Sequence, residues 1–158
     1  MDDRLIIRRA VPGDASSIAL LSGVLGYPVE APAVAQRLRR LLPRPEDVVL
    51  VAEDEPGHLV GWLHGADQEL LESGRRCEIL GLVVAAECRG RGVGRRLVEA
   101  VERWAAERGL AEMTVRSNVV RPESHPFYER LGYSRTKTQH AYRKPVGEAG
   151  TPRVAGAP

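Results

Sequence analysis

The sequence predicts a single α/β domain (α+β), in which short apolar strands alternate with amphipathic helices. Short apolar segments recur along the chain and are bounded by proline and glycine turns, which is typical of strands. Between them, apolar residues recur every three or four positions, as in helices that bury one face. At 158 residues and 43% hydrophobic content, the chain is long enough for one domain with a substantial core.

The N-terminal part is expected to form one strand and two helices. Residues 4–10 are rich in leucine and isoleucine and predict the first strand. Asp14 follows a Pro-Gly turn and is a good N-cap for the first helix, which ends at Gly26. A second short helix begins near Pro32, and Pro43 ends it.

The middle of the chain predicts three strands. Residues 48–52 and 59–65 are apolar and flank an Asp-Glu-Pro-Gly turn at 54–57, so they form a hairpin. A third strand is expected over 75–85. Strict alternation along this strand would place four residues on one face: Glu78, Leu80, Leu82 and Val84.

A long helix is expected over about 92–108, because its apolar residues form one stripe. A short strand should follow at 113–116, and Ser124 is a plausible N-cap for a helix that ends at Gly132. Residues 133–137 and 140–144 are expected to form two last strands. Glycine, alanine and proline dominate thereafter, which predicts a domain over 1–145 and a disordered tail over 146–158.

The stretch from Leu82 to Leu97 organises the chain, since an apolar strand leads through a glycine-rich turn directly into the long helix. Glycines let the backbone turn sharply and let a ligand approach. The first amides of a helix lack intrahelical partners and face outward, so they form a site for a phosphate or pyrophosphate. Four arginines add positive charge there: Arg89, Arg91, Arg95 and Arg96.

Two nucleotide-binding patterns fit this turn poorly. A Walker loop needs a Gly-Lys-Ser/Thr ending, and this stretch contains no lysine. A dinucleotide fingerprint needs a third glycine, where this sequence has Leu97 or Arg95. The following strand also ends near Ser117 rather than at the acid that would bind a ribose.

The pattern Arg-x-x-Gly-x-Gly at Arg89, Gly92 and Gly94 resembles the acyl-CoA loop of the GCN5-related N-acetyltransferase (GNAT) superfamily. A second motif, Phe-Tyr-Glu-Arg-Leu-Gly-Tyr at 127–133, resembles the Phe-Tyr-x-x-Leu-Gly-Phe helix of the same superfamily. The resemblance covers about 5–144. It implies the GNAT fold, a mixed and largely antiparallel central sheet flanked by about four helices.

The resemblance implies an enzyme that transfers an acetyl group directly from acetyl-CoA to a primary amine in a ternary complex. The acceptor is unidentified: a small metabolite, an aminoglycoside-like drug and a protein amine are all open. No metal is required for this chemistry. The alternative is a non-catalytic acyl-CoA-binding or regulatory module on the same fold.

The resemblance also assigns residues to the co-substrate. The strand before the loop would offer a backbone amide, at Val84, to the acyl oxygen. Asn118 matches a family asparagine that contacts the pantetheine arm, but it lies ten residues before the helix tyrosine instead of the usual seven, and Arg121 could contact phosphate instead. The complete expected site is Leu82, Val83, Val84, Arg89, Gly90, Arg91, Gly92, Val93, Gly94, Arg95 and Asn118.

Two side chains are candidates for the proton transfers. Tyr128 matches the family tyrosine near the CoA sulfur, where a phenol is suited to protonating a thiolate; its alternative role is core packing. Glu78 lies eleven residues before Arg89, the offset of the strand glutamate that serves as base in histone-type members. Alternatively, Glu78 is a solvated residue near the start of a strand. A chain of water molecules would then take the proton in place of a dedicated base.

Composition limits the other classes of function. Cys77 and Cys88 are too few for a disulfide framework or metal cluster, and direct transfer needs no cysteine nucleophile. A net charge of +2 does not favour a nucleic-acid partner, and no apolar run approaches the length of a membrane span. We expect a cytoplasmic protein, and a homodimer is expected from the family alone.

Overall fold

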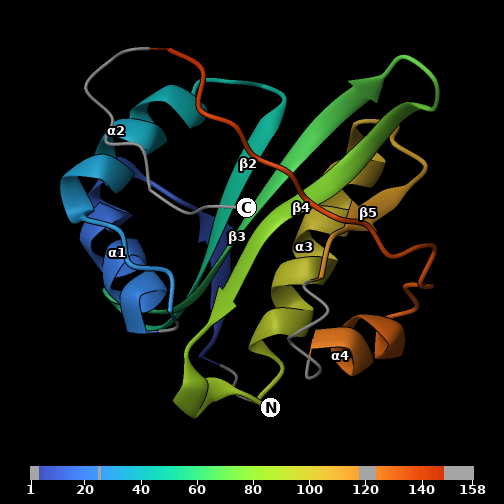
Figure 1. Ribbon diagram of the computed structural model, residues 1–158. Helices are drawn as coiled ribbons and strands as arrows, with labels where there is room; N and C mark the ends of the chain where they lie inside the picture. Colours follow the sequence, from blue (N-terminus) through green and yellow to red (C-terminus); the bar gives the residue numbers. More distant parts are fainter. Residues whose placement is uncertain (1–3, 25, 118–123, 148–158) are drawn as a thin grey trace. The chain divides into compact units, whose positions relative to one another are not determined.

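The computed structural model describes residues 4–24, 26–117 and 124–147. The chain divides into two compact units, residues 1–116 and 117–158. The first unit contains a five-stranded sheet in the order β1-β2-β3-β4-β5 (Figure 1). The strands are β1 Ile6–Arg9, β2 Asp47–Glu55, β3 His58–Leu70, β4 Gly74–Val84 and β5 Met113–Val115. Neighbours are antiparallel except β4 and β5, which are parallel, so the predicted mixed, largely antiparallel sheet is confirmed.

Two helices, α1 Ala15–Val24 and α2 Ala31–Leu41, pack on one face of this sheet, and α3 Val93–Glu107 packs on the other (Figure 1). A short 3-10 turn, η1 Pro12–Asp14, precedes α1. The core beneath α1 and α2 consists of small and branched apolar residues from both layers, which include Ile18, Val34, Leu38, Val49 and Val51.

Glycines in β3 let α3 lie close to the sheet. A Cβ atom on Gly65 would be 2.7 Å from Cγ2 of Val101, and one on Gly61 would be 3.2 Å from Cδ1 of Leu97. Leu97 and Val101 are both fully buried. Because any larger residue at these two positions would push the helix away, the glycines fix the spacing between α3 and the sheet.

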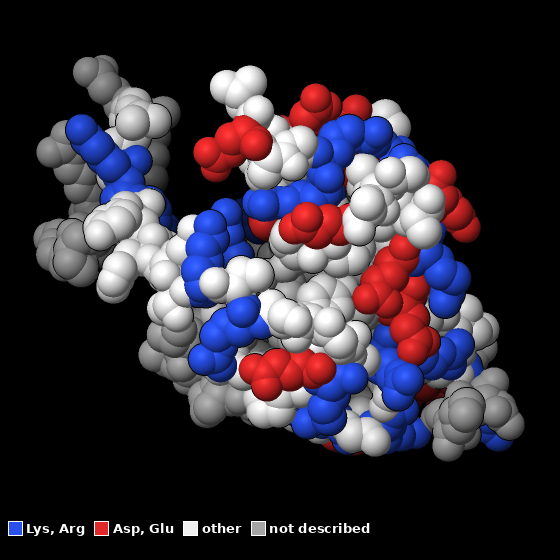
Figure 2. All heavy atoms as spheres, turned by 90° about the vertical axis from the view of Figure 1, so that its right-hand side faces the viewer, with Lys and Arg blue, Asp and Glu red and all other residues white. Residues whose placement is uncertain are grey.

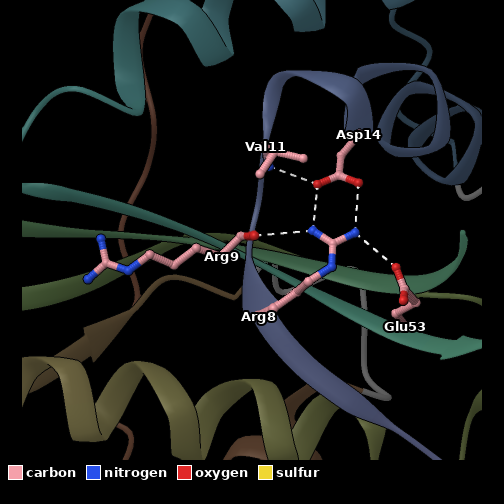
Figure 3. Close-up of polar contacts among 5 residues, drawn as sticks. All are labelled: Arg8, Arg9, Val11, Asp14 and Glu53. Atoms are coloured by element: carbon pink, nitrogen blue, oxygen red, sulfur yellow. Dashed lines mark hydrogen bonds and ion pairs between the residues drawn. The ribbon is translucent and has the colours of Figure 1, made fainter. Parts of the chain in front are cut away.

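A charged network ties β1 to β2 and to the turn before α1 (Figure 3). Arg8 forms two hydrogen bonds with Asp14, at 2.8 and 2.9 Å, and a third with Glu53 at 2.9 Å. Asp14 Oδ2 also accepts the amide of Val11 at 2.8 Å. The Asp14 carboxylate therefore caps the 3-10 turn η1, at whose end it lies. The sequence had suggested instead that it caps the first amides of α1.

The second unit contains one described helix, α4 Ser124–Arg130, followed by a turn at Gly132. The two strands predicted at 133–137 and 140–144 are wrong, because residues 133–147 form neither helix nor strand. Residues 134–147 are all exposed. Without a buried face or a pairing partner, β-branched or aromatic residues do not hold a strand.

Among the described residues, no helix is both long and apolar enough to cross a membrane. On the face drawn in Figure 2, arginines and lysines are interspersed with aspartates and glutamates and do not form one continuous basic patch. Such mixing of charges does not produce a large electrostatic potential of one sign on that face.

Candidate functional site

The candidate site begins where β4 and β5 separate. The two strands pair only over Cys77–Ile79 and Met113–Val115, although β4 continues to Val84. Within the described part of the chain, the last five residues of β4 have no strand beside them on the β5 side. Among the described residues, their backbone groups on that side have no strand partner, and such groups need hydrogen-bond partners from elsewhere.

A β-bulge at Leu80 decides which amides point to this open edge. The register pairs Ile79 with Gly65 and Gly81 with His64, which leaves Leu80 as one extra residue on β4. Before the bulge, Cys77 donates its amide toward β5, to the carbonyl of Glu112 at 2.9 Å. After the bulge, Ala85 donates toward β3, to Val60 at 2.8 Å.

In an unbroken strand these two amides would point to the same side, because they lie an even number of residues apart. The bulge reverses the alternation. It follows that the amides of Leu82 and Val84 face the open edge, while the amide of Val83 faces β3. Two parallel donors on an unpaired strand can polarise a carbonyl oxygen placed between them and the next strand.

The bulge also corrects the predicted faces of this strand. A Cβ atom on Gly81 would contact the Trp62 ring, which packs on the α1–α2 side, whereas Cys77 lies near Gly65 on the α3 side. Glu78 therefore shares its face with Leu80, Gly81 and Val83 and not with Leu82 and Val84. The sequence prediction failed here because strict alternation assumes one residue on β4 for each residue on β3.

The glycine-rich turn follows β4 directly and leads into α3. A 3-10 turn, η2 Ala86–Cys88, is followed by Gly90 and Gly92 with φ of 79° and 81°, a backbone conformation that favours glycine. The first helical hydrogen bond of α3 runs from the amide of Arg96 to Gly92, at 3.0 Å. The three amides before it have no carbonyl partner in the preceding turn: Val93, Gly94 and Arg95.

Such amides, together with the dipole of a fifteen-residue helix, are able to bind an anion. Arg91 lies on the turn itself, and Arg95 lies in the first turn of α3. Arg95 is exposed and forms an ion pair with Glu99 at 2.9 Å, and Arg91 Nη1 lies 3.8 Å from Cys88 Sγ. The predicted loop residues thus lie together at the end of β4, within 82–95.

Tyr128 lies in α4 of the second unit and is half-buried. Its ring meets Phe127 edge-on at a centroid distance of 5.0 Å and Tyr133 at 5.9 Å. Asn118 and Arg121, the two alternatives for a CoA contact, lie outside the described residues. The role assigned to Tyr128 stays a prediction.

Comparison with known proteins decides the family. Residues 20–133 match the model of the Acetyltransferase (GNAT) family. The chain belongs to the GNAT acetyltransferase family. The predicted fold, the acetyltransferase class and acetyl-CoA as co-substrate are thereby confirmed.

Three relatives of this GNAT protein illustrate the likeness. It is 28% identical to an aminoglycoside N(6')-acetyltransferase type 1 of Stenotrophomonas maltophilia, over 89% of this chain and 93% of that one. It is 32% identical to the uncharacterized N-acetyltransferase YhdJ of Bacillus subtilis, over 48% of this chain and only about half (53%) of the relative. A solved structure of AAC(6')-Iy with a CoA-S-monomethyl-acetylneamine bisubstrate analogue superposes with a TM-score of 0.79 at 21% identity, covering 90% of this chain and 99% of that one.

Glu78, the predicted base of this GNAT protein, is buried at 6% exposure, and two polar side chains lie next to it. Its Oε1 lies 3.3 Å from the hydroxyl of Thr114 and 3.6 Å from Nη2 of Arg76. A hydroxyl and a guanidinium thus lie beside one of the two oxygens of this carboxylate. The sequence could not show this, because Thr114 reaches Glu78 through the parallel pairing of β4 and β5.

The two cysteines do not have the surroundings of nucleophiles. Cys77 is fully buried, and burial raises the pKa of its thiol to about 11. Burial also raises the pKa of Cys88, although Arg91 partly opposes the shift. Among the described residues, no group of histidine, cysteine and acidic side chains could hold a metal ion.

One polar pair on the sheet was missed by sequence reasoning. His64 Nε2 lies 2.8 Å from Oδ1 of Asp47, and Arg44 Nε lies 3.0 Å from the other carboxylate oxygen. The sequence showed a histidine inside a strand but gave no partner for it. The register of β2 and β3, which pairs Asp47 with Ala66, brings the two side chains together.

Proposed function

We propose that this GNAT protein transfers the acetyl group of acetyl-CoA to a primary amine of a polycationic small molecule of the aminoglycoside class. The observation that carries the acetyl-transfer site is the open edge of β4, where two backbone amides face the same side and the strand leads directly into the glycine turn. The alignment with an aminoglycoside N(6')-acetyltransferase over nearly the whole length of both chains supports the acceptor class.

In this proposal, the pyrophosphate of acetyl-CoA binds the free amides at the start of α3, and Arg89, Arg91 and Arg95 supply positive charge around it. The pantetheine arm then runs along the unpaired edge of β4. Its thioester oxygen receives hydrogen bonds from the amides of Leu82 and Val84, which stabilise the negative charge that develops during attack.

The acceptor amine approaches from the α1–α2 side of the sheet, where Glu78 and Leu80 lie. Tyr128 donates a proton to the departing CoA thiolate. The catalytic domain extends over 1–145, and the protein works in the cytoplasm, where acetyl-CoA is supplied. The family and the arrangement of β4 and α3 support the placement of acetyl-CoA in this proposal.

The proposal is tested in two steps. Calorimetric titration with acetyl-CoA, beside ATP and NAD, should give micromolar binding to acetyl-CoA alone. Release of free CoA thiol is then measured with neamine, with an aminoglycoside that carries a hydroxyl in place of the 6'-amine, and with a lysine-containing peptide. Turnover with neamine but not with the 6'-hydroxyl compound supports the proposal, whereas turnover with the peptide alone would assign a protein acceptor.

A further inference from the structure

Leu80 is a large apolar residue that the fold leaves exposed at the start of the open edge of β4. It is 46% exposed, whereas Ile79 before it is 4% exposed and Val83 after it is 5% exposed. Leu80 is the extra residue of the bulge, so it has no partner of its own on β3. It also follows Ile79, the last residue of β4 that pairs with β5. Its side chain is therefore not covered by a neighbouring strand on either side.

The Trp62 ring keeps the Leu80 side chain from folding back onto the sheet. The next position on the same face is Gly81, where a Cβ atom would be 2.8 Å from Cζ3 of Trp62. The indole thus fills the space over Gly81, and a hydrogen bond of 3.1 Å from its Nε1 to the hydroxyl of Ser22 holds it there. Because the ring leaves no room above the glycine, the Leu80 side chain stays at the edge of the α1–α2 face.

We propose that Leu80 is a specificity-determining residue, which selects the acceptor amine by the shape of the carbon that carries the nitrogen. The inference rests on the proposed function, because it concerns the acceptor of the same acetyl transfer. An amine on an unbranched methylene carbon passes the Leu80 side chain, whereas a methyl branch on that carbon collides with it. Leu80 acts by excluding one class of acceptor and takes no part in the proton transfers.

The spacing along β4 brings Leu80 next to the reacting carbon. Leu80 precedes Leu82 by two residues, which is about 7 Å along a strand. In the proposed function, the amide of Leu82 holds the thioester oxygen at about 2.9 Å, outward from the open edge. The amine attacks from the α1–α2 face, the face on which the Leu80 side chain stands. The carbon that carries the amine therefore comes within van der Waals distance of Leu80, about 4 Å.

Other residues of β4 on this face are less able to set such a limit. Glu78 and Val83 lie on the same face, but they are only 6% and 5% exposed. Gly81 has no side chain, and Trp62 covers it. Leu80 is the one exposed large apolar residue of β4, so an acceptor that approaches this face meets it first.

The test measures the ratio of kcat/KM for two amines that differ by one methyl group on the carbon that carries the nitrogen. Gentamicin C1a and gentamicin C2 form such a pair at the 6'-amine. Benzylamine and 1-phenylethylamine form a second pair, without the aminoglycoside skeleton. Release of CoA thiol is followed with saturating acetyl-CoA, and acetyl-CoA affinity and the thermal midpoint are measured for every variant.

Wild type is compared with Leu80→Ala and with a matched control, Leu71→Ala. Leu71 is fully exposed and lies in the turn between β3 and β4, at the opposite end of β4 from the glycine turn. The control removes the same atoms from an exposed leucine that is remote from the open edge. It therefore separates the position of Leu80 from its exposure.

We expect wild type to prefer the unbranched amine of each pair by about tenfold to a hundredfold, since one methyl group against a packed wall has an effect of this size. Leu80→Ala should lower that preference about fivefold or more, chiefly by raising kcat/KM for the branched amine. Leu71→Ala should keep the wild-type ratio. The ratio does not depend on the fraction of folded enzyme, so a purely structural role of Leu80 would leave it unchanged.

Equal acetylation of both amines of a pair by wild type, or a wild-type preference in Leu80→Ala, would overturn the role of Leu80 while leaving the acetyltransferase intact. A Leu80→Ala variant that gains turnover with propionyl-CoA and keeps its acceptor preference would place Leu80 beside the acyl group, which also overturns the role. If benzylamine is acetylated and neither gentamicin is, the aminoglycoside class falls and the benzylamine pair decides on Leu80. A wild type that binds acetyl-CoA and acetylates none of the four amines would overturn the proposed function, and this role with it.

Discussion

Trp62 lies over Gly81 so closely that a Cβ atom on Gly81 would be 2.8 Å from Cζ3 of the indole ring. The ring is held there by a hydrogen bond of 3.1 Å from its Nε1 to the hydroxyl of Ser22 in α1, which in turn donates to the carbonyl of Ile18. The residue after the bulge is thereby connected to the helix layer above it.

Gly81→Ala should therefore destabilise the protein. The rigid indole has to move and weaken its bond to Ser22, and we expect a loss of about 1–3 kcal/mol in the free energy of unfolding. Urea unfolding measures the change. Gly23→Ala is the control, because nothing lies within 4 Å of that position in α1, and replacing a helical glycine should stabilise by up to about 1 kcal/mol. Equal stability of both variants would show that Trp62 moves freely.

The ion pair between Arg8 and Asp14 predicts a loss of stability in acid. The guanidinium of Arg8 holds the pKa of Asp14 below its usual value, so the folded state favours the carboxylate. This stabilisation is present above the ordinary pKa of about 4 and is lost as pH falls through the lower pKa of the folded state. Asp14→Asn should cost about 3 kcal/mol near neutrality, since it leaves a partly buried guanidinium without its main partner.

The measurement is the free energy of unfolding of wild type and Asp14→Asn between pH 2 and pH 7. The gap between them should narrow as pH falls below about 4. Glu99→Gln is the control, because its ion pair with Arg95 is exposed and should contribute less than about 1 kcal/mol at any pH. A gap that is constant with pH would assign the effect to packing instead of charge.

The sequence predicted the order of elements well, because apolar spacing and turn residues are local signals. The hairpin, the long helix and the glycine turn all depend on residues close together in the chain. The two final strands were predicted wrongly, since a strand needs a pairing partner that local pattern cannot supply.

The candidate site was predictable only in its local part. Glycines at 90 and 92 adopt positive φ, as the turn required. The bulge at Leu80 was not predictable, because it is a property of the register between two strands and not of either sequence. The contact between His64 and Asp47 was not predictable either. The two residues lie seventeen positions apart in the chain, and the pairing of β2 with β3 brings them together.

Gly92 offers a test of the anion site that separates binding from backbone strain. Gly92→Glu places a negative charge and a side chain at the N-terminus of α3, so acetyl-CoA binding should fall at least a hundredfold in calorimetry. Gly74→Glu is the matched control, because Gly74 has nearly the same φ, 78° against 81°, and open space around it, but is the first residue of β4, at the far end of that strand from the glycine turn. Both variants carry the same cost of a strained residue, about 1–2 kcal/mol, and only Gly92→Glu should lose affinity. Retained affinity in Gly92→Glu would remove the glycine turn from the site.

Tyr128 offers a test of thiolate protonation. Tyr128→Phe removes only the hydroxyl, and the ring keeps its edge-on contacts with Phe127 and Tyr133. We expect kcat for thiol release to fall about tenfold to a hundredfold, because the departing thiolate loses its proton donor, while acetyl-CoA affinity stays within twofold. Tyr142→Phe is the control, since Tyr142 is 91% exposed and the change should have no effect. Unchanged turnover in Tyr128→Phe across pH 6–9 would instead make Tyr128 a packing residue, with solvent as the proton source for the thiolate.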